Sequence, residues 1–279
     1  MVFLEPKTAD IQKYYGDEYR KKHSPVIGRA LDSQEIFDIY LPYQEARVKR
    51  LEHILRPDMK VLDIGCSAGH FMHALKDRVQ ECIGLEYNIE NAEFIKEKLG
   101  LKVYSTPINE TDLPLEYFDL ITAFQMFEHV DKPFEFLHNI SKYLKKDGYL
   151  CIETTNVEDA LLDVYELKEY ADFWYREPHL FNYSPKTLKL ILQRAGFDGE
   201  VGTIQRINFL NHMNWVLNKA PQRGADIHMA APKLFEKLDS PIKQEIDDLI
   251  QETDKRYREI LNKYKKGESL LFIGKKKLG

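Results

Sequence analysis

Short apolar runs alternate with amphipathic stretches through the middle of the chain, from residue 58 to about 207. Short apolar runs bounded by turn residues are typical of buried strands, and apolar residues at three- and four-residue steps are typical of helices that cover a sheet. The predicted strands are Lys60–Ile64, Cys82–Glu86, Lys102–Ser105, Phe118–Phe124, Gly148–Thr154 and Glu200–Ile207. The alternation predicts an α/β fold with a mostly parallel sheet.

Two of the intervening helices carry clear end signals. The first is expected to be capped by Asp131, with Pro133 in its first turn and Lys145–Lys146 in its last. The second is expected to be capped by Ser184 and stopped by Gly196. Polar caps, an early proline, late cations and a terminal glycine are each favoured at these positions of a helix.

The flanks of this region differ from it. Residues 1–57 are aromatic and charged, with a predicted helix at Leu41–Leu55, and we expect them to form a helical arm over the mouth of a ligand site. Residues 209–267 are predicted to be helical, with a long helix from Ser240 to Gly267 whose apolar stripe packs on its own domain or forms a dimer seam. Residues 268–279 contain a final predicted strand, Ser269–Ile273.

Candidate chemistry begins at the turn after the first strand. The strand carries Asp63, and the turn that leads into the next helix contains Gly65 and Gly69. Glycine lets a ligand approach the backbone N–H groups of such a turn. A dinucleotide-binding Gly-x-Gly-x-x-Gly would need glycine where Ser67 and His70 stand, which disfavours an NAD-dependent oxidoreductase.

A second acid, Glu86, ends the next predicted strand. It lies one strand–helix unit further on, where a Rossmann-like fold holds a ribose, and a carboxylate can accept hydrogen bonds from both ribose hydroxyls.

The spacing Asp-x-Gly-x-x-x-Gly resembles motif I of the class I S-adenosylmethionine-dependent methyltransferases. The run Phe118–Gln125, followed by Glu128–Val130, resembles strand four and its trailing loop in that family. The resemblance implies a Rossmann-like seven-stranded sheet whose last strand is antiparallel, with residues 58–208 as the cofactor-binding core and 209–267 as an insertion before the last strand. The phrases around Glu177–Pro185 and Arg206–Trp215 resemble a subgroup associated with sugar and surface-polysaccharide modification.

The resemblance also implies a cofactor, S-adenosylmethionine, and its product, S-adenosylhomocysteine. The positions that it assigns to cofactor binding are Asp63, Gly65, Gly69, Glu86, Tyr87, Ile108, Asn109 and Gln125. The family usually has aspartate where this chain has Asn109.

A small-molecule acceptor, expected to be a carbohydrate, follows from the subgroup resemblance. His129 and His179 are the candidate bases, whereas His212 is expected to be structural. The residues expected to contact the acceptor are Glu153, Asn156, Trp174, Tyr175 and Tyr183.

No metal is expected, although one motif bears on the question. Gln125-x-x-Glu128-His129 resembles the Glu-x-x-Glu-His motif of ubiquinone-pathway O-methyltransferases, which is associated with a divalent cation. The amide at Gln125 weakens a site for a hard cation.

Composition narrows the partners. The formal net charge of −5 argues against a dedicated nucleic-acid binder. Three cysteines, at positions 66, 82 and 151, are expected to be buried reduced thiols, which favours a cytoplasmic setting. We expect no signal peptide and no membrane span, and either a monomer or a homodimer. The alternatives are a methyltransferase of a quinone precursor or of tRNA, and a non-catalytic binding module that keeps the fold.

Overall fold

The computed structural model describes residues 2–3, 30–175, 179–221 and 232–277. Its described elements are β1 (Val2–Phe3), α3 (Ser33–Tyr40), η2 (Leu41–Tyr43), α4 (Gln44–Leu51), β2 (Lys60–Ile64), α5 (His70–Leu75), β3 (Glu81–Leu85), α6 (Ile89–Phe94), η3 (Ile95–Leu99), β4 (Lys102–Tyr104), η4 (Ile108–Glu110), β5 (Phe118–Phe124), η5 (Phe127–His129), α7 (Pro133–Tyr143), β6 (Leu144–Thr155), α8 (Ala160–Asp163), α9 (Lys168–Trp174), β7 (Phe181–Asn182), α10 (Pro185–Arg194), β8 (Phe197–Ile204), α11 (Phe209–Asn218), α12 (Pro241–Lys263) and β9 (Ser269–Lys276).

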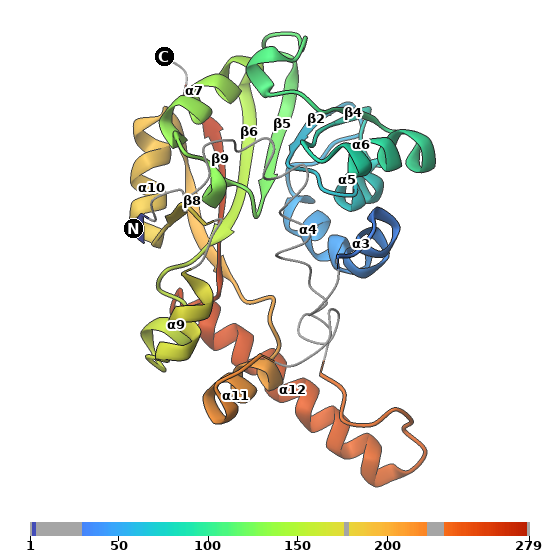
Figure 1. The fold of residues 1–279 in the computed structure, drawn as a ribbon, viewed down its shortest axis with the longest axis vertical. Helices are drawn as coiled ribbons and strands as arrows, with labels where there is room; N and C mark the ends of the chain where they lie inside the picture. The colour runs from blue at the N-terminus through green and yellow to red at the C-terminus, as the bar shows by residue number, and fades with distance from the viewer. Residues whose placement is uncertain (1, 4–29, 176–178, 222–231, 278–279) are drawn as a thin grey trace.

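A seven-stranded sheet forms the centre of the molecule, in the order β4-β3-β2-β5-β6-β9-β8 (Figure 1). The strands from β4 to β6 pair in parallel, whereas β9 lies antiparallel between β6 and β8. This confirms the expected seven-stranded fold with an antiparallel last strand. The strand order reverses between β2 and β5, and ligands of open α/β sheets bind at the carboxyl ends of the strands at such a point.

Helices cover both faces of the sheet because successive strand residues point to opposite sides. Val61 and Leu120 pack in one cluster with residues of α4 and α5, and Leu62 and Ile121 pack in another with residues of α7 and α10. The strands are therefore buried on both faces, as is typical of parallel sheets.

Several predicted boundaries shift. The helix expected over Leu41–Leu55 begins as a short 3-10 turn and ends as α4 at Leu51. Lys132, not Asp131, precedes α7, and no side chain caps that end. Lys145–Lys146 lie in β6 rather than in the last turn of the helix, because Leu144 already adopts extended backbone. Ser184 does cap α10, in a reciprocal pair of hydrogen bonds with Thr187.

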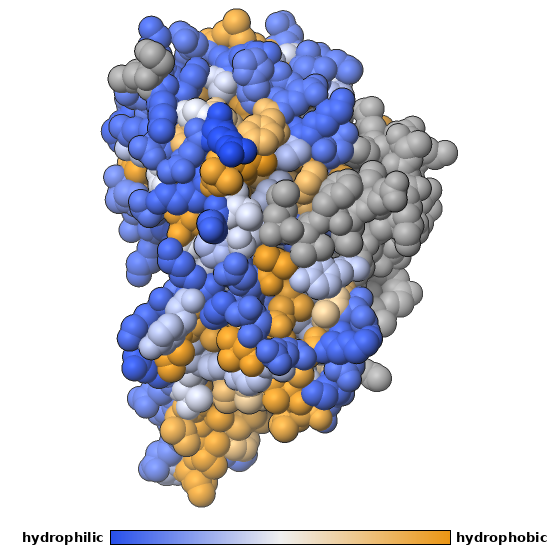
Figure 2. All heavy atoms as spheres, turned by 90° about the vertical axis from the view of Figure 1, so that its left-hand side faces the viewer, coloured by the Kyte–Doolittle hydropathy of each residue, from blue (hydrophilic) through white to orange (hydrophobic). Residues whose placement is uncertain are grey.

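The long helix α12 is present but ends at Lys263, before Gly267, and its apolar stripe faces its own domain only in part: Leu261 is buried and Tyr257 packs on Phe209. Ile242, Leu249 and Tyr264 are 67%, 61% and 64% exposed. Figure 2 shows apolar side chains gathered on the lower part of the molecule, which α9, α11 and α12 build. The helix also docks through a polar contact: buried Asp254 accepts a hydrogen bond from the Phe209 N–H at the start of α11.

A small antiparallel pair of β1 with β7 was not predicted. Tyr14, Tyr15 and Tyr19 of the expected arm lie outside the described residues, as does Glu177 of the subgroup phrase. Among the residues that the structure describes, no helix combines the length and the apolar character needed to cross a bilayer.

Candidate functional site

A cavity of about 870 Å³ opens at the carboxyl ends of β2, β3 and β5. This volume lies near the upper end of the range for small-molecule sites. Its walls come from α3 and α4, the loop after β2, the ends of β3 and β5, the loop after β8, and α12. Of the residues predicted to bind a cofactor, those that line it are Asp63, Gly65, Glu86, Tyr87, Ile108, Asn109 and Gln125.

The turn after β2 has left-handed backbone at Gly65, Ser67 and Gly69. A Cβ at Gly65 would lie 2.8 Å from Cγ of Met126, so a side chain there is excluded both by strain and by space. Gly69 begins α5, and a Cβ there would meet Ile95 at 2.7 Å. Gly69 is not among the residues that line the cavity; its position allows α5 to pack closely on η3.

The Glu86 carboxylate is held in place by two backbone groups. The Ser67 N–H donates to Oε2 and the Asn88 N–H donates to Oε1, each at 2.7 Å. Hydrogen bonds to an ionised acceptor are stronger than neutral ones. The two backbone bonds orient the Glu86 carboxylate toward the cavity, and each carboxylate oxygen can accept more than one hydrogen bond.

Asp63 is 2% exposed and accepts a hydrogen bond of 2.6 Å from the Thr122 hydroxyl. Burial raises the pKa of Asp63 to about 7, against the opposing effects of Thr122 and Arg47. A buried carboxyl poised near neutrality next to a cavity favours a cationic ligand, since a nearby positive charge stabilises the ionised form.

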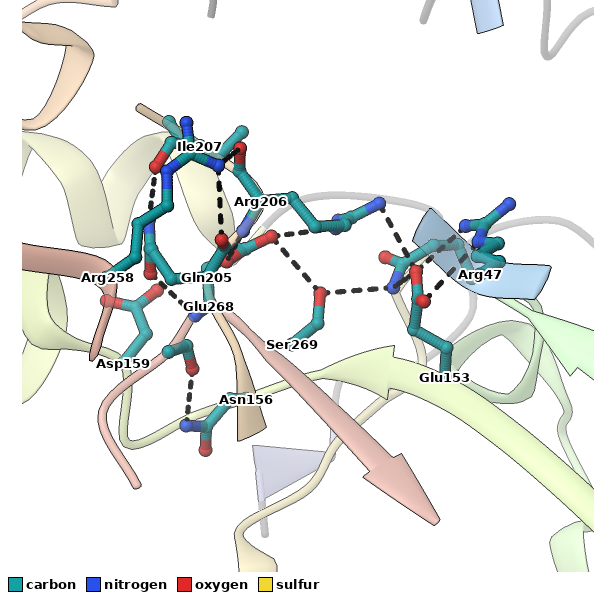
Figure 3. A network of polar contacts seen from close by, with 12 residues as sticks. Arg47, Glu153, Asn156, Asp159, Gln205, Arg206, Ile207, Arg258, Glu268 and Ser269 are labelled. Atoms are coloured by element: carbon teal, nitrogen blue, oxygen red, sulfur yellow. Dashed lines mark hydrogen bonds and ion pairs between the residues drawn. The ribbon is translucent and has the colours of Figure 1, made fainter. Parts of the chain in front are cut away.

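A second buried carboxylate, Glu153 at the end of β6, is held by arginines from both sides (Figure 3). Arg47 on α4 approaches Oε1 at 2.8 Å, and Arg206 after β8 approaches it at 3.4 Å. Gln125 donates to the same oxygen at 3.2 Å. Burial alone would raise the pKa of Glu153, but the two guanidinium groups outweigh it and lower the pKa to about 2.

The same network continues into the helical insertion (Figure 3). Arg206 pairs with Glu268 at 2.7 Å, and Arg258 of α12 donates to the Arg206 carbonyl at 2.6 Å. Both arginines line the cavity, so α12 contributes a residue to the cavity wall as well as to this polar network. His212 forms hydrogen bonds with the Gln205 amide through Nε2 and with the Tyr257 hydroxyl through Nδ1. It therefore joins two parts of this network, which is the structural role expected of it.

His129 lines the cavity, whereas His179 is not among the described residues that line it. Their ring centroids are 5.2 Å apart, and ligand-capable atoms of these two residues and Glu128 lie within 4.8 Å of one another. Glu128 is 1% exposed and accepts from the Thr154 hydroxyl. This is the one cluster in the described part of the chain that could hold a metal ion.

The residues expected to touch the acceptor lie elsewhere. Asn156 is fully buried and donates to the carbonyls of Lys265 and Gly267, and Tyr183 is fully buried between Phe127 and Phe181. Trp174 packs on Tyr170 in a separate cluster. None of Glu153, Asn156, Trp174, Tyr175 or Tyr183 is among the described residues that line the cavity.

Sequence reasoning missed several residues that do line it: Tyr40, Arg47, Arg50, His70, Gln205, Arg206 and Arg258. One signal was present, since Arg47 and Arg50 stand three apart on α4 and therefore share a helix face. Arg206 follows shortly after the end of β8, on the loop that leads into the insertion.

A sequence profile described as a methyltransferase domain matches residues 39–200. Among curated proteins, the chain is 31% identical over 107 residues to the ubiquinone biosynthesis O-methyltransferase of Haemophilus ducreyi, covering 35% of this chain and 45% of that protein. It is 31% identical over 115 residues to the uncharacterized methyltransferase YcgJ of Bacillus subtilis, covering 39% and 46%. The chain thus spans about half the length of the curated relatives it matches.

Solved structures give the same fold. A SAM-dependent methyltransferase from Archaeoglobus fulgidus superimposes with a TM-score of 0.55 at 24% identity, over 85% of this chain and 94% of that one. The YcgJ protein of Bacillus subtilis superimposes with a TM-score of 0.53 at 18% identity, over 85% and 98%.

Proposed function

The chain belongs to the methyltransferase domain family, and on that basis we propose that it transfers a methyl group from S-adenosylmethionine to a hydroxyl oxygen of a small polar acceptor. The observation that carries the proposal is the cavity in which Glu86, Asp63 and Gly65 meet, with His129 on the same wall. A cavity of about 870 Å³ has room for a cofactor and a small acceptor together.

The residues of the cavity fit the cofactor. The oriented Glu86 carboxylate matches the two ribose hydroxyls, and buried Asp63 matches a cationic group of the amino-acid part. Tyr87, Ile108 and Asn109 line the wall beyond Glu86, where they would enclose the adenine. When bound, S-adenosylmethionine supplies an activated methyl group.

The protein's own contribution is alignment and proton removal. Holding two reactants close together in the reactive orientation lowers the activation free energy by roughly 7–11 kcal/mol in favourable cases. A hydroxyl acceptor must also lose its proton, and His129 is the histidine of the cavity wall on the loop after β5 that can take it. A well-placed base contributes a factor of roughly 10²–10⁴. His179, 5.2 Å from the His129 ring centroid, would then position it rather than touch the acceptor.

Two acceptor classes remain to be separated. The resemblance around Glu177–Pro185 favours a sugar, nucleotide sugar or related metabolite of polysaccharide biosynthesis. The printed names of the curated relatives favour a quinone precursor, but Gln125 replaces the first acid of their motif. The cavity wall carries four arginines, which supports a polar acceptor over an apolar one.

The cofactor assignment is tested by calorimetry with S-adenosylhomocysteine. Because a hydrogen bond to a charged group contributes roughly 1.5–3 kcal/mol, Glu86→Ala should weaken binding more than tenfold. Glu93→Ala, which removes an exposed carboxylate from neighbouring α6, is the matched control and should bind as the wild type does. Equal affinities of Glu86→Ala and wild type would reject the ribose assignment. Transfer of label from S-adenosylmethionine to a panel of sugars, nucleotide sugars and phenols, read by mass spectrometry, tests the activity.

A further inference from the structure

One end of the cavity carries more positive than negative charge. The buried carboxylates of Glu153 and Glu268 interact with three guanidinium groups, those of Arg47, Arg50 and Arg206, whereas Arg258 pairs with buried Asp254. Arg47 and Arg206 pair with Glu153, and Arg206 also pairs with Glu268. The two carboxylates are thus shared between two of the three cations.

Arg50 is the third cation. Its side chain lines the cavity, yet no hydrogen bond or ion pair joins it to any residue in the described ranges. Burial lowers the pKa of Arg50, while the more distant charge of Glu153 partly opposes this. A partly desolvated guanidinium that no carboxylate pairs with directly is stabilised when an anion meets it.

Arg50 lies away from the position expected for the ribose of the cofactor, on the part of the cavity that is left for the acceptor. Glu86, the expected ribose ligand, follows β3, whereas Glu153 ends β6, and β2 and β5 lie between these strands. Three strand spacings separate the two carboxylates by roughly 14 Å. Arg50 lies about one helical turn from Arg47, which pairs with Glu153, so α4 presents both arginines to the cavity at its Glu153 end, away from the ribose position.

We propose that Arg50, flanked by Arg47 and Arg206, forms a subsite for an acidic group of the acceptor, a carboxylate or a phosphate. A guanidinium binds either group through two parallel hydrogen bonds, which fixes orientation as well as charge. Arg47 and Arg206 keep their own carboxylates, so the excess positive charge of this group is that of Arg50. The inference rests on the proposed function, and it narrows the acceptor to an anionic molecule such as a sugar acid, a sugar phosphate or a carboxylated phenol.

The experiment uses inorganic phosphate as the probe, titrated by calorimetry into protein saturated with S-adenosylhomocysteine at fixed ionic strength. The wild-type complex should bind phosphate, and Arg50→Gln should bind it at least tenfold more weakly. Lys49→Gln removes the same charge from an exposed neighbour on α4, and it should change phosphate affinity less than twofold. Arg50→Met serves as a second neutral variant should the glutamine variant fail to fold. Equal phosphate binding by the wild type and a neutral Arg50 variant would overturn the proposal.

A second arm distinguishes the acceptor from the cofactor, whose methionine part also carries a carboxylate. Arg50→Gln should bind S-adenosylhomocysteine within twofold of the wild type. A tenfold loss of that affinity would assign Arg50 to the cofactor and overturn the acceptor subsite. A wild-type protein that does not bind S-adenosylhomocysteine at all would instead overturn the proposed function, so the two failures are separable.

Discussion

Asp63 should release a proton when the cofactor binds. Its carboxyl is buried, receives one hydrogen bond from Thr122, and has a pKa raised to about 7 by burial. A ligand ammonium placed beside it would favour the carboxylate and lower that pKa. At pH 6, 7 and 8 a group with a pKa of 7 is protonated to about 0.9, 0.5 and 0.1, so the release should fall through these values as the pH rises.

The assay is calorimetry of S-adenosylhomocysteine binding in two buffers with different ionisation enthalpies. The difference between the observed enthalpies gives the number of protons released at each pH. Asp63→Asn keeps the shape and removes the titration, so its release at pH 6 should be smaller by nearly one proton. Adenosine, which lacks the ammonium group, should release none from the wild type. A release at pH 6 that is the same in the wild type and Asp63→Asn would refute the reasoning.

Two further predictions concern the base and the frame of the site. His129→Gln should lower kcat by a factor of roughly 10²–10⁴ while the affinity for S-adenosylhomocysteine is kept. The control, His138→Gln on the exposed side of α7, should leave kcat unchanged. A loss of kcat below tenfold in His129→Gln would show that His129 is not the base. Glu153→Gln should lower the free energy of unfolding by about 3–5 kcal/mol near neutral pH, because it leaves the largely buried guanidinium of Arg47 without its carboxylate and Arg206 with Glu268 alone. Since the pKa of Glu153 is lowered to about 2, this stabilisation is fully present above its ordinary pKa of 4.5 and is lost as the pH falls toward 2. Urea unfolding at pH 7 and pH 3 measures it, and a difference between the two proteins that does not shrink at pH 3 would contradict the assignment.

The parallel core could be predicted because its signals are local. The strands Lys60–Ile64 and Phe118–Phe124 have the predicted bounds. The glycine-containing turn after β2 was predicted to approach a ligand, and Gly65 of that turn lines the cavity. These features depend on residues within one strand or one turn, where side-chain periodicity and backbone preference act directly.

The ion pairs around Glu153 could not be predicted from the sequence, because the paired residues are far apart along the chain. Arg47 and Glu153 are 106 positions apart, and nothing in the sequence around either residue indicates that the two side chains meet. Glu153 was accordingly expected to bind an acceptor, whereas the structure assigns its charge to arginines. The packing of α12 was predicted only in part for a related reason. Tyr257 and Leu261 of its apolar stripe pack inward as expected, but the buried hydrogen bond of Asp254 has as its partner the backbone N–H of Phe209, on another helix.

The pairing of β8 with β9 has a consequence for how the molecule can vary. Ile204 and Ser269 stand opposite each other in the register, and just beyond this pair Arg206, two residues after Ile204, forms a salt bridge with Glu268, the residue before Ser269. The insertion therefore leaves and re-enters the sheet at a single point, so its length contributes little to the entropy of closing the sheet. Residues 209–267 can therefore vary in length without changing the pairing of the sheet strands.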